Sequence, residues 1–182
     1  RMDGLFRDGY SAVFIGTGVW RPNSLGIKGE SLGNVHFAID YLCNPAVYNL
    51  GETVSVIGAG NAAIDAARTI LRHGARKVTI YARKPVLAAS PREVEYAGVD
   101  GVDFHNCVRP VEIHPEGAVF RRLAYDAEGH AGEVEGEDFL EPSDSVVIAI
   151  GQGPKDKIVS TSRGIEMNER GLVKTDAQGA TT

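Results

Sequence analysis

A short run of β-branched residues stands before a glycine-containing turn in the first half of the chain. Thr53–Ile57 has the composition of a strand buried on both faces of a parallel sheet. The Ala-rich stretch from Asn61 to His73 repeats its apolar residues at helical spacing, and Gly74 follows where a helix would end. Lys77–Ala82 predicts a second strand. Together these segments predict a βαβ unit, whose crossover is right-handed in nearly all known cases.

Two further apolar runs each end in a pair of glycines. Ser11–Ile15 leads into Gly16-Thr17-Gly18. Asp144–Ile150 leads into Gly151-Gln152-Gly153. We interpret them as a matched pair of strands whose glycine turns allow another group to approach the backbone closely. Two ordinary strand-end turns would give the same pattern, so both interpretations stay open.

Helical periodicity is absent between residues 102 and 142. Short apolar runs alternate there with turn sequences that contain glycine or proline, which predicts a small antiparallel β-meander on the sheet. From Asp126 to Asp144 the chain has eight Asp or Glu and no Lys or Arg, which we interpret as a solvated face that protects a sheet edge. The predicted strands of the meander are Cys107–Ile113, Ala118–Tyr125 and Glu133–Leu140.

The composition is that of a folded globular protein. Of 182 residues, 43% are hydrophobic and 24% are charged, which is enough apolar material for a sizeable core. The net charge of −5 disfavours binding to nucleic acid or to an anionic membrane. No apolar run approaches the ~20 residues that span a bilayer. The two cysteines, Cys43 and Cys107, form no CxxC motif and no metal-ligand set, so we predict no metal site and a reduced, cytoplasmic setting.

The turn after the first strand of the βαβ unit fits a Gly-x-Gly-x-x-Ala fingerprint. Gly58 permits a sharp turn, Gly60 leaves room for a pyrophosphate, and Ala63 keeps the helix close to the strand. The first N–H groups of the helix, at Asn61 and Ala62, are free to bind the anion. The pattern predicts a dinucleotide site in an α/β, Rossmann-like fold, and a tight turn without a ligand is the alternative.

The end of the second strand indicates which dinucleotide is bound. NAD-binding proteins usually have an acidic residue there, which accepts a hydrogen bond from the ribose 2′-hydroxyl. This chain has Arg83-Lys84 instead, and no acidic residue between Asp65 and Glu93. Because Arg and Lys attract a 2′-phosphate that a carboxylate would repel, we predict NADPH as the cofactor. Arg92 could close over the phosphate, but we expect it to cap a short helix or to pair with Glu95.

These residues resemble the small (β) subunit of NADPH-dependent glutamate synthase and its relatives, a family of flavoproteins with two dinucleotide domains. The resemblance covers most of the chain and is best in residues 10–100 and 143–182. It implies a Rossmann-like FAD/NAD(P)-binding fold, a short helix over Val35–Asn44, and no catalytic side chain. The matching segments are Gly16–Pro22, Gly26–Glu30, Val56–Arg68, Tyr81–Lys84 and Ala149–Pro154.

The resemblance also implies segments that are absent from this sequence. Family members have an iron–sulfur region, an FAD fingerprint and a Gly-Gly-Asp segment near the flavin, so we expect an excised NADP(H)-binding domain. Residues 51–142 would form its core, and 1–50 and 143–182 would be strands and linkers toward the FAD-binding domain of the parent chain. FAD, iron–sulfur centres and a large amidotransferase or other electron-accepting subunit are expected only with the parent.

The predicted cofactor-binding residues come from four glycine-containing or basic segments. They are Gly16, Thr17, Gly18, Gly58, Gly60, Asn61, Ala62, Ala63, Arg83, Lys84, Gly151 and Gln152. Two alternatives to an enzyme that delivers hydride to FAD stay open: a module that senses NADP(H) without redox turnover, and an enzyme of the thioredoxin reductase type. The missing CxxC disfavours the second, because a dithiol relay needs two thiols.

Overall fold

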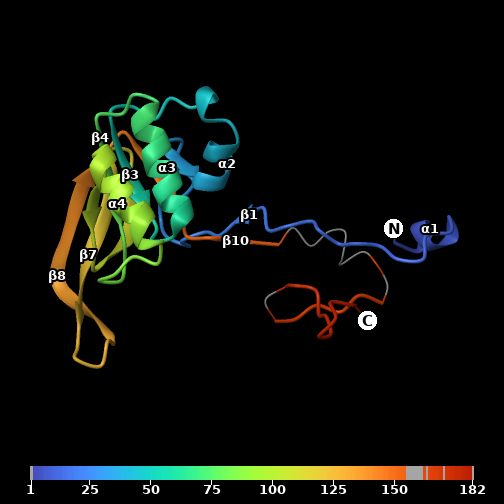
Figure 1. The fold of residues 1–182 in the computed structure, drawn as a ribbon. Helices are drawn as coiled ribbons and strands as arrows, with labels where there is room; N and C mark the ends of the chain where they lie inside the picture. Colours follow the sequence, from blue (N-terminus) through green and yellow to red (C-terminus); the bar gives the residue numbers. More distant parts are fainter. Residues whose placement is uncertain (1, 155–161, 163, 170, 182) are drawn as a thin grey trace. The chain divides into compact units, whose positions relative to one another are not determined.

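The computed structural model describes residues 2–154, 162, 164–169 and 171–181 (Figure 1). It contains two compact units, Pro22–Gly151 and a second one made of Arg1–Arg21 with Gln152–Thr182. Its helices are α1 (Met2–Arg7), α2 (Ala38–Cys43), the 3-10 turn η1 (Pro45–Val47), α3 (Asn61–Arg72) and α4 (Pro91–Asp100). Its strands are β1 (Arg21–Pro22), β2 (Val35–Phe37), β3 (Thr53–Ile57), β4 (Lys77–Tyr81), β5 (Asp103–His105), β6 (Val108–His114), β7 (Gly117–Tyr125), β8 (Ala131–Pro142), β9 (Ser145–Ile148) and β10 (Gln152–Gly153).

A five-stranded parallel sheet forms the centre of the larger unit. Its strand order is β2-β9-β3-β4-β5, and β3 pairs in register with β4 from Thr53 opposite Lys77 to Ile57 opposite Tyr81. The predicted βαβ unit is confirmed, because α3 connects these two strands and ends where Gly74 adopts a left-handed conformation, with φ of 104°. The predicted parallel sheet is confirmed as well.

The central sheet is covered on both faces, as Figure 1 shows. Helices α2, α3 and α4 pack on one face, where Val56 of β3, Ile80 of β4 and Val147 of β9 are buried against Ile64 and other residues of the helices. The antiparallel sheet β6-β7-β8 packs on the other face. Successive residues of a strand point to opposite faces, so a strand covered on both sides is apolar throughout.

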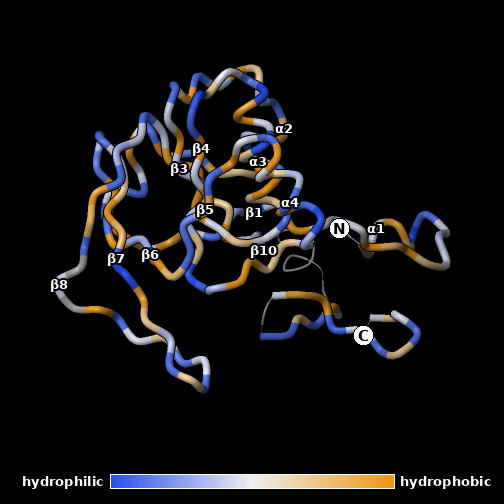
Figure 2. The backbone as a smooth tube through the Cα atoms, turned by 60° about the vertical axis from the view of Figure 1, so that its left-hand side comes forward, coloured by the Kyte–Doolittle hydropathy of each residue, from blue (hydrophilic) through white to orange (hydrophobic). Residues whose placement is uncertain are grey.

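An aromatic stack joins the antiparallel meander to the central sheet. Tyr81 at the end of β4 stacks on Phe120 of β7, with ring centroids 4.1 Å apart. Phe139 of β8 continues the stack toward His105 of β5, at 5.4 Å. The predicted meander is thus confirmed. The β7–β8 hairpin extends beyond its neighbours, and its tip is mostly hydrophilic (Figure 2).

The acidic run of the meander is engaged in cross-strand ion pairs rather than only solvated. Arg121 of β7 binds Asp138 of β8 at 2.6 Å and Glu133 of β8 at 2.8 Å. Arg109 of β6 also binds Glu133, at 2.5 Å. These arginines lower the pKa of both carboxyl groups, chiefly through the hydrogen bonds from Arg121. The predicted exposed face therefore also holds the three strands together.

Two local predictions were wrong. Residues 11–15 form no strand, and the Phe14 side chain is 94% exposed. Among the described residues, this segment has no neighbouring strand to supply hydrogen bonds, without which an extended segment is not a stable strand. Over Val35–Asn44, the helix is limited to α2, because the first three residues form β2 and pair in parallel with β9.

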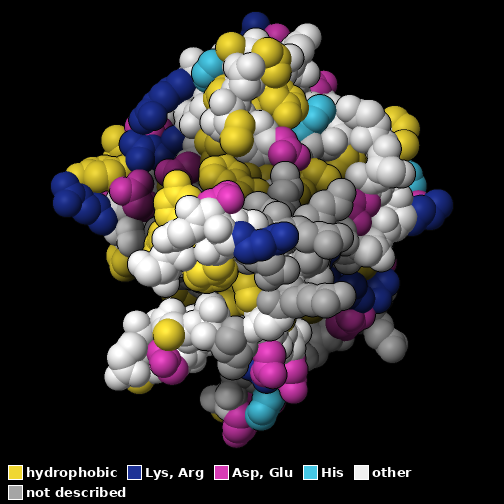
Figure 3. Space-filling model, turned by 90° about the vertical axis from the view of Figure 1, so that its right-hand side faces the viewer, with side chains coloured by type: hydrophobic (Ala, Val, Ile, Leu, Met, Phe, Trp, Pro, Cys, Tyr) yellow, Lys and Arg dark blue, Asp and Glu magenta, His cyan; other side chains and the backbone are white. Residues whose placement is uncertain are grey.

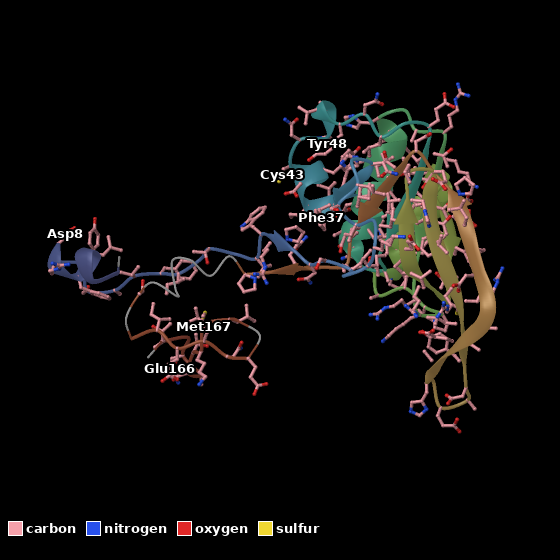
Figure 4. The ribbon with its side chains drawn as sticks, turned by 180° about the vertical axis from the view of Figure 1, so that it is seen from behind. Asp8, Phe37, Cys43, Tyr48, Glu166 and Met167 are labelled. Carbon is pink, nitrogen blue, oxygen red and sulfur yellow. The ribbon has the colours of Figure 1, made fainter. Side chains whose placement is uncertain are left out.

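The smaller unit combines residues from both ends of the chain. Its hydrogen-bonded features are α1, the pairing of β1 with β10, and short bridges near the C-terminus such as Met167 opposite Val173. Glu166 binds Lys174 at 3.1 Å across the same turn, and Glu166 and Met167 are labelled in Figure 4. Part of the predicted flanking segment 143–182, residues 155–161, lies outside the described residues.

Candidate nucleotide-binding site

The glycine turn between β3 and α3 is packed tightly on its sheet side. The Gly58 N–H donates to the Tyr81 carbonyl at 3.1 Å, and the Ala149 N–H donates to the Ile57 carbonyl at 2.8 Å. A Cβ atom on Gly58 would collide with the Ala149 carbonyl, so this position accepts only glycine without a shift of the backbone. The turn is thereby fixed between the ends of β4 and β9.

Gly60 faces open space instead. It is the N-cap of α3, with extended backbone angles of φ −96° and ψ 176°, and a Cβ built on it would meet nothing within 4 Å. Among the described residues, no side chain caps this helix. The free N–H groups of its first turn therefore lie beside an open position, which is the arrangement that binds anionic phosphates. This arrangement fits a dinucleotide pyrophosphate.

The residues that follow Gly60 differ in their burial and in their contacts. Ala63 is fully buried against the sheet, which agrees with the close helix–strand packing predicted for it. Asn61 is exposed, and its Oδ1 accepts a hydrogen bond from the Ser90 N–H at 3.0 Å. The Ala89 N–H also donates to the Ala59 carbonyl, at 2.8 Å. The loop from β4 to α4 is therefore tied to the glycine turn, a connection that the sequence did not indicate.

Arg83 and Lys84 follow β4 at the carboxyl edge of the sheet, as predicted. Both side chains are exposed, and neither forms an ion pair with another described residue. The Arg83 carbonyl accepts a hydrogen bond from the Tyr125 hydroxyl at 2.8 Å. The Pro85 carbonyl accepts one from Asn106 Nδ2, also at 2.8 Å. Tyr125 and Asn106 were missed by sequence reasoning, because their role depends on contacts between distant segments.

Arg92 behaves differently from the prediction. It lies on α4, whose N-cap is Ser90, and its Nε donates to the Tyr96 hydroxyl at 2.9 Å. Its guanidinium also lies 5.3 Å from the centre of the Tyr96 ring. The expected pairing with Glu95 was wrong, because Tyr96, four positions further along the helix, engages the Arg92 guanidinium through both its hydroxyl and its ring.

The glycine turn lies where the order of the strands in the sheet reverses. From β3 the chain proceeds through β4 to β5 on one side, whereas β9 lies on the other side of β3. In open α/β sheets, ligands bind outside the carboxyl ends of the strands at such a switch point. Gly151 lies past the end of β9, where its carbonyl accepts from the Asn23 N–H at 3.1 Å.

The remaining predicted residues belong to the smaller unit, so their part in a nucleotide site stays a prediction. These residues are Gly16, Thr17, Gly18 and Gln152. Within that unit, the backbone at Gly18 has φ of 67°, and the indole nitrogen of Trp20 lies 2.8 Å from the position a Cβ would take. The left-handed backbone therefore favours glycine there for local reasons, whether or not a ligand approaches.

The two cysteines are free and lie on different layers of the larger unit. Cys43 ends α2 on the helical side, where Figure 4 labels it with Phe37 and Tyr48, and its side chain is exposed. Cys107 precedes β6 of the meander and has a left-handed backbone, with φ of 59°. The two thiols are not paired with each other.

The described residues contain no group of three His, Cys, Asp or Glu that could hold a metal ion. Within the same residues, no helix is long and apolar enough to cross a membrane. Basic and acidic side chains are interspersed on the face drawn in Figure 3.

Comparisons with known proteins agree with this geometry. The chain is 34% identical to the glutamate synthase [NADPH] small chain of Halomonas elongata, over 94% of this chain and 41% of the relative. It is 35% identical to the NADP(+)-dependent formate dehydrogenase subunit beta of Moorella thermoacetica, over 96% of this chain and 27% of the relative. The resemblance to glutamate synthase small subunits is thus confirmed, and the chain spans less than half the length of these relatives.

Solved structures show the same fold. The thioredoxin reductase of T. acidophilum superposes with a TM-score of 0.70 at 23% identity, over 88% of this chain and 50% of that chain. The profile of the pyridine nucleotide-disulphide oxidoreductases matches residues 3–182. Because that match extends over nearly the whole sequence, the chain belongs to the pyridine nucleotide-disulphide oxidoreductase family.

Proposed function

We propose that the larger unit binds NADP(H), with the pyrophosphate at the glycine turn and the 2′-phosphate of the adenosine ribose at Arg83 and Lys84. The observation that carries the proposal is the open, uncapped start of α3 together with an exposed basic pair at the end of the adjacent strand β4. The guanidinium of Arg83 can donate two parallel hydrogen bonds to a phosphate, and Lys84 adds a point charge.

We further propose that the parent protein is a flavin-dependent oxidoreductase. Bound NADPH would supply a hydride to FAD on a second dinucleotide domain, and electrons would continue through iron–sulfur centres to a partner subunit. The family match and the names of the relatives in Halomonas elongata and Moorella thermoacetica support this proposal. This chain's own residues would bind and orient the nucleotide. The smaller unit, with Gly16–Gly18 and Gln152, would adjoin the FAD domain.

The exposed apolar side chains of the smaller unit support that last assignment. Phe14 is 94% exposed and Trp20 is 50% exposed. Burying one such aromatic side chain is worth roughly 2–3 kcal/mol, so these residues are well suited to contact another domain of the parent. A module that only sensed NADP(H) would give the same larger unit, and flavin reduction by the parent protein distinguishes the two.

Titration of the 182-residue chain with NADPH and NADH tests the nucleotide assignment. We expect NADPH to bind more tightly than NADH. We expect Arg83→Ala to weaken NADPH binding by about 10- to 150-fold, which is the loss of affinity that corresponds to one hydrogen bond to a charged group. NADH binding should change by less than about twofold. Lys77→Ala is the matched control, because it removes one exposed positive charge from the amino end of the same strand.

Three results would contradict the assignment. If the wild-type chain binds NADH as tightly as NADPH, the 2′-phosphate is not recognised. If Arg83→Ala weakens both nucleotides equally, or if Lys77→Ala has the same effect as Arg83→Ala, the pair contributes only general electrostatic attraction. Added salt should reduce the wild-type preference in part, because the Debye length falls to about 3 Å at 1 M ionic strength.

A further inference from the structure

We propose that Tyr125 is a positioning residue for nucleotide selectivity, because its hydroxyl holds the backbone of Arg83 in place. The inference rests on the proposed function and adds to it a residue outside the βαβ unit. The Tyr125 hydroxyl donates to the Arg83 carbonyl at 2.8 Å, across 42 positions of sequence. Tyr125 is the last residue of β7, so the tip of the meander meets the loop that carries the basic pair.

Several other contacts fasten the same loop to the meander side of the sheet. The Ala82 N–H donates to the His105 carbonyl at 3.0 Å, and the Ala82 carbonyl accepts from the Val108 N–H at 3.1 Å. Asn106 Nδ2 donates to the Pro85 carbonyl at 2.8 Å. Residues 82–85 are therefore held by main-chain and side-chain hydrogen bonds from β5, β6, β7 and the β5–β6 connection.

The Arg83 side chain has no such support. It is exposed and forms no ion pair within the described part of the chain. Before a ligand binds, the backbone position from which this side chain extends is the part of its geometry that is restrained, and the Tyr125 hydroxyl contributes to that restraint. A bidentate contact with a phosphate requires a defined approach, and fixing that approach before binding reduces the entropy lost on binding. The restraint should therefore strengthen binding of the 2′-phosphate and should not affect binding of the pyrophosphate at Gly60.

Tyr125→Phe removes the hydroxyl and keeps the ring. We expect it to weaken NADPH binding by about two- to twelvefold, the range for one neutral hydrogen bond, and to leave NADH binding unchanged. The control is Tyr96→Phe, which removes another hydroxyl that is hydrogen-bonded to an arginine, Arg92, but on α4. Tyr96→Phe should leave the NADPH/NADH ratio unchanged. Calorimetric titration of the whole chain with both nucleotides measures these ratios.

A second measurement tests whether Tyr125 acts through Arg83. In an Arg83→Ala background, Tyr125→Phe should reduce NADPH binding by much less than it does in the wild type. Equal effects in both backgrounds, an unchanged NADPH/NADH ratio, or equal losses for the two nucleotides would overturn the inference. Absence of an NADPH preference in the wild type would instead refute the proposed function. If Tyr125→Phe does not fold, Asn106→Ala frees the Pro85 carbonyl and permits the same comparison.

Discussion

Replacing Gly60 with valine tests whether this glycine is needed for ligand binding rather than for folding. The Gly60 backbone is extended, so an L-residue can adopt its conformation without strain. A Cβ there would meet nothing within 4 Å, and the added methyl groups would extend into the open side of the glycine turn. Gly58 is the contrasting position, because a Cβ on it would collide with the Ala149 carbonyl.

The expected effect on stability is small. Valine is a poorer N-cap than glycine, and we estimate a loss of about 1 kcal/mol for Gly60→Val. For a protein of this size, such a loss lowers the melting temperature by about 2–4 °C, which leaves the protein folded at room temperature. Gly58→Ala should lower the melting temperature by considerably more, because a backbone carbonyl must move to make room.

The expected effect on binding is large. The methyl groups would separate the pyrophosphate from the N–H groups at the start of α3, and two hydrogen bonds to a charged group are worth about 3–6 kcal/mol. NADPH affinity should therefore fall by at least about 150-fold. Calorimetric titration measures the affinity, and thermal unfolding with circular dichroism confirms the fold. NADPH affinity within about threefold of the wild type would show that the glycine turn has only a structural role.

Two further predictions concern the meander and its contact with the sheet. Arg121 holds the pKa of Asp138 and Glu133 below their usual values of 3.8 and 4.5. The stability that these ion pairs give to the fold is therefore complete above the usual pKa values and is lost as the pH falls through the lowered pKa values. Arg121→Gln should therefore lower the urea midpoint at neutral pH but not near pH 2, and an equal loss at both would contradict this. Burial raises the pKa of Tyr81 to about 12 and also raises that of Tyr41, so ultraviolet titration should show these tyrosines ionising later than the exposed ones. Stability should fall as the pH rises from 10 toward 12, and ionisation of every tyrosine near 10 would refute the prediction.

Elements fixed by local sequence were predicted well. The strand Thr53–Ile57 has the same bounds in the structure, and α3 begins at the predicted Asn61. Burial on both faces makes a parallel strand uniformly apolar, and a helix on its surface shows an apolar stripe, so both are visible in the sequence. The meander was predicted too, because turn residues separate its strands clearly.

Elements that depend on a distant partner were predicted poorly. The three residues of β2 pair with β9, more than a hundred residues further along the chain, and without that partner they were assigned to a helix. Residues 11–15 have strand composition but no described partner, so composition alone gave the wrong assignment. At the candidate site, the glycine turn follows a local rule, whereas the hydrogen bond between Asn61 and Ser90 depends on how the following loop folds back.

The acidic run of the meander raises an electrostatic question that only the structure answers. Tyr125 brings this run next to Arg83, and free carboxylates there would oppose a bound phosphate. Instead, Asp126 accepts a hydrogen bond from the His130 N–H at 2.7 Å within its own turn, and Glu133 and Asp138 bind Arg121. The charges of Glu133 and Asp138 are thus compensated by Arg121, while Arg83 keeps an exposed guanidinium without an ion-pair partner among the described residues. These ion pairs therefore reduce the repulsion that the acidic run of the meander would exert on a phosphate bound at Arg83.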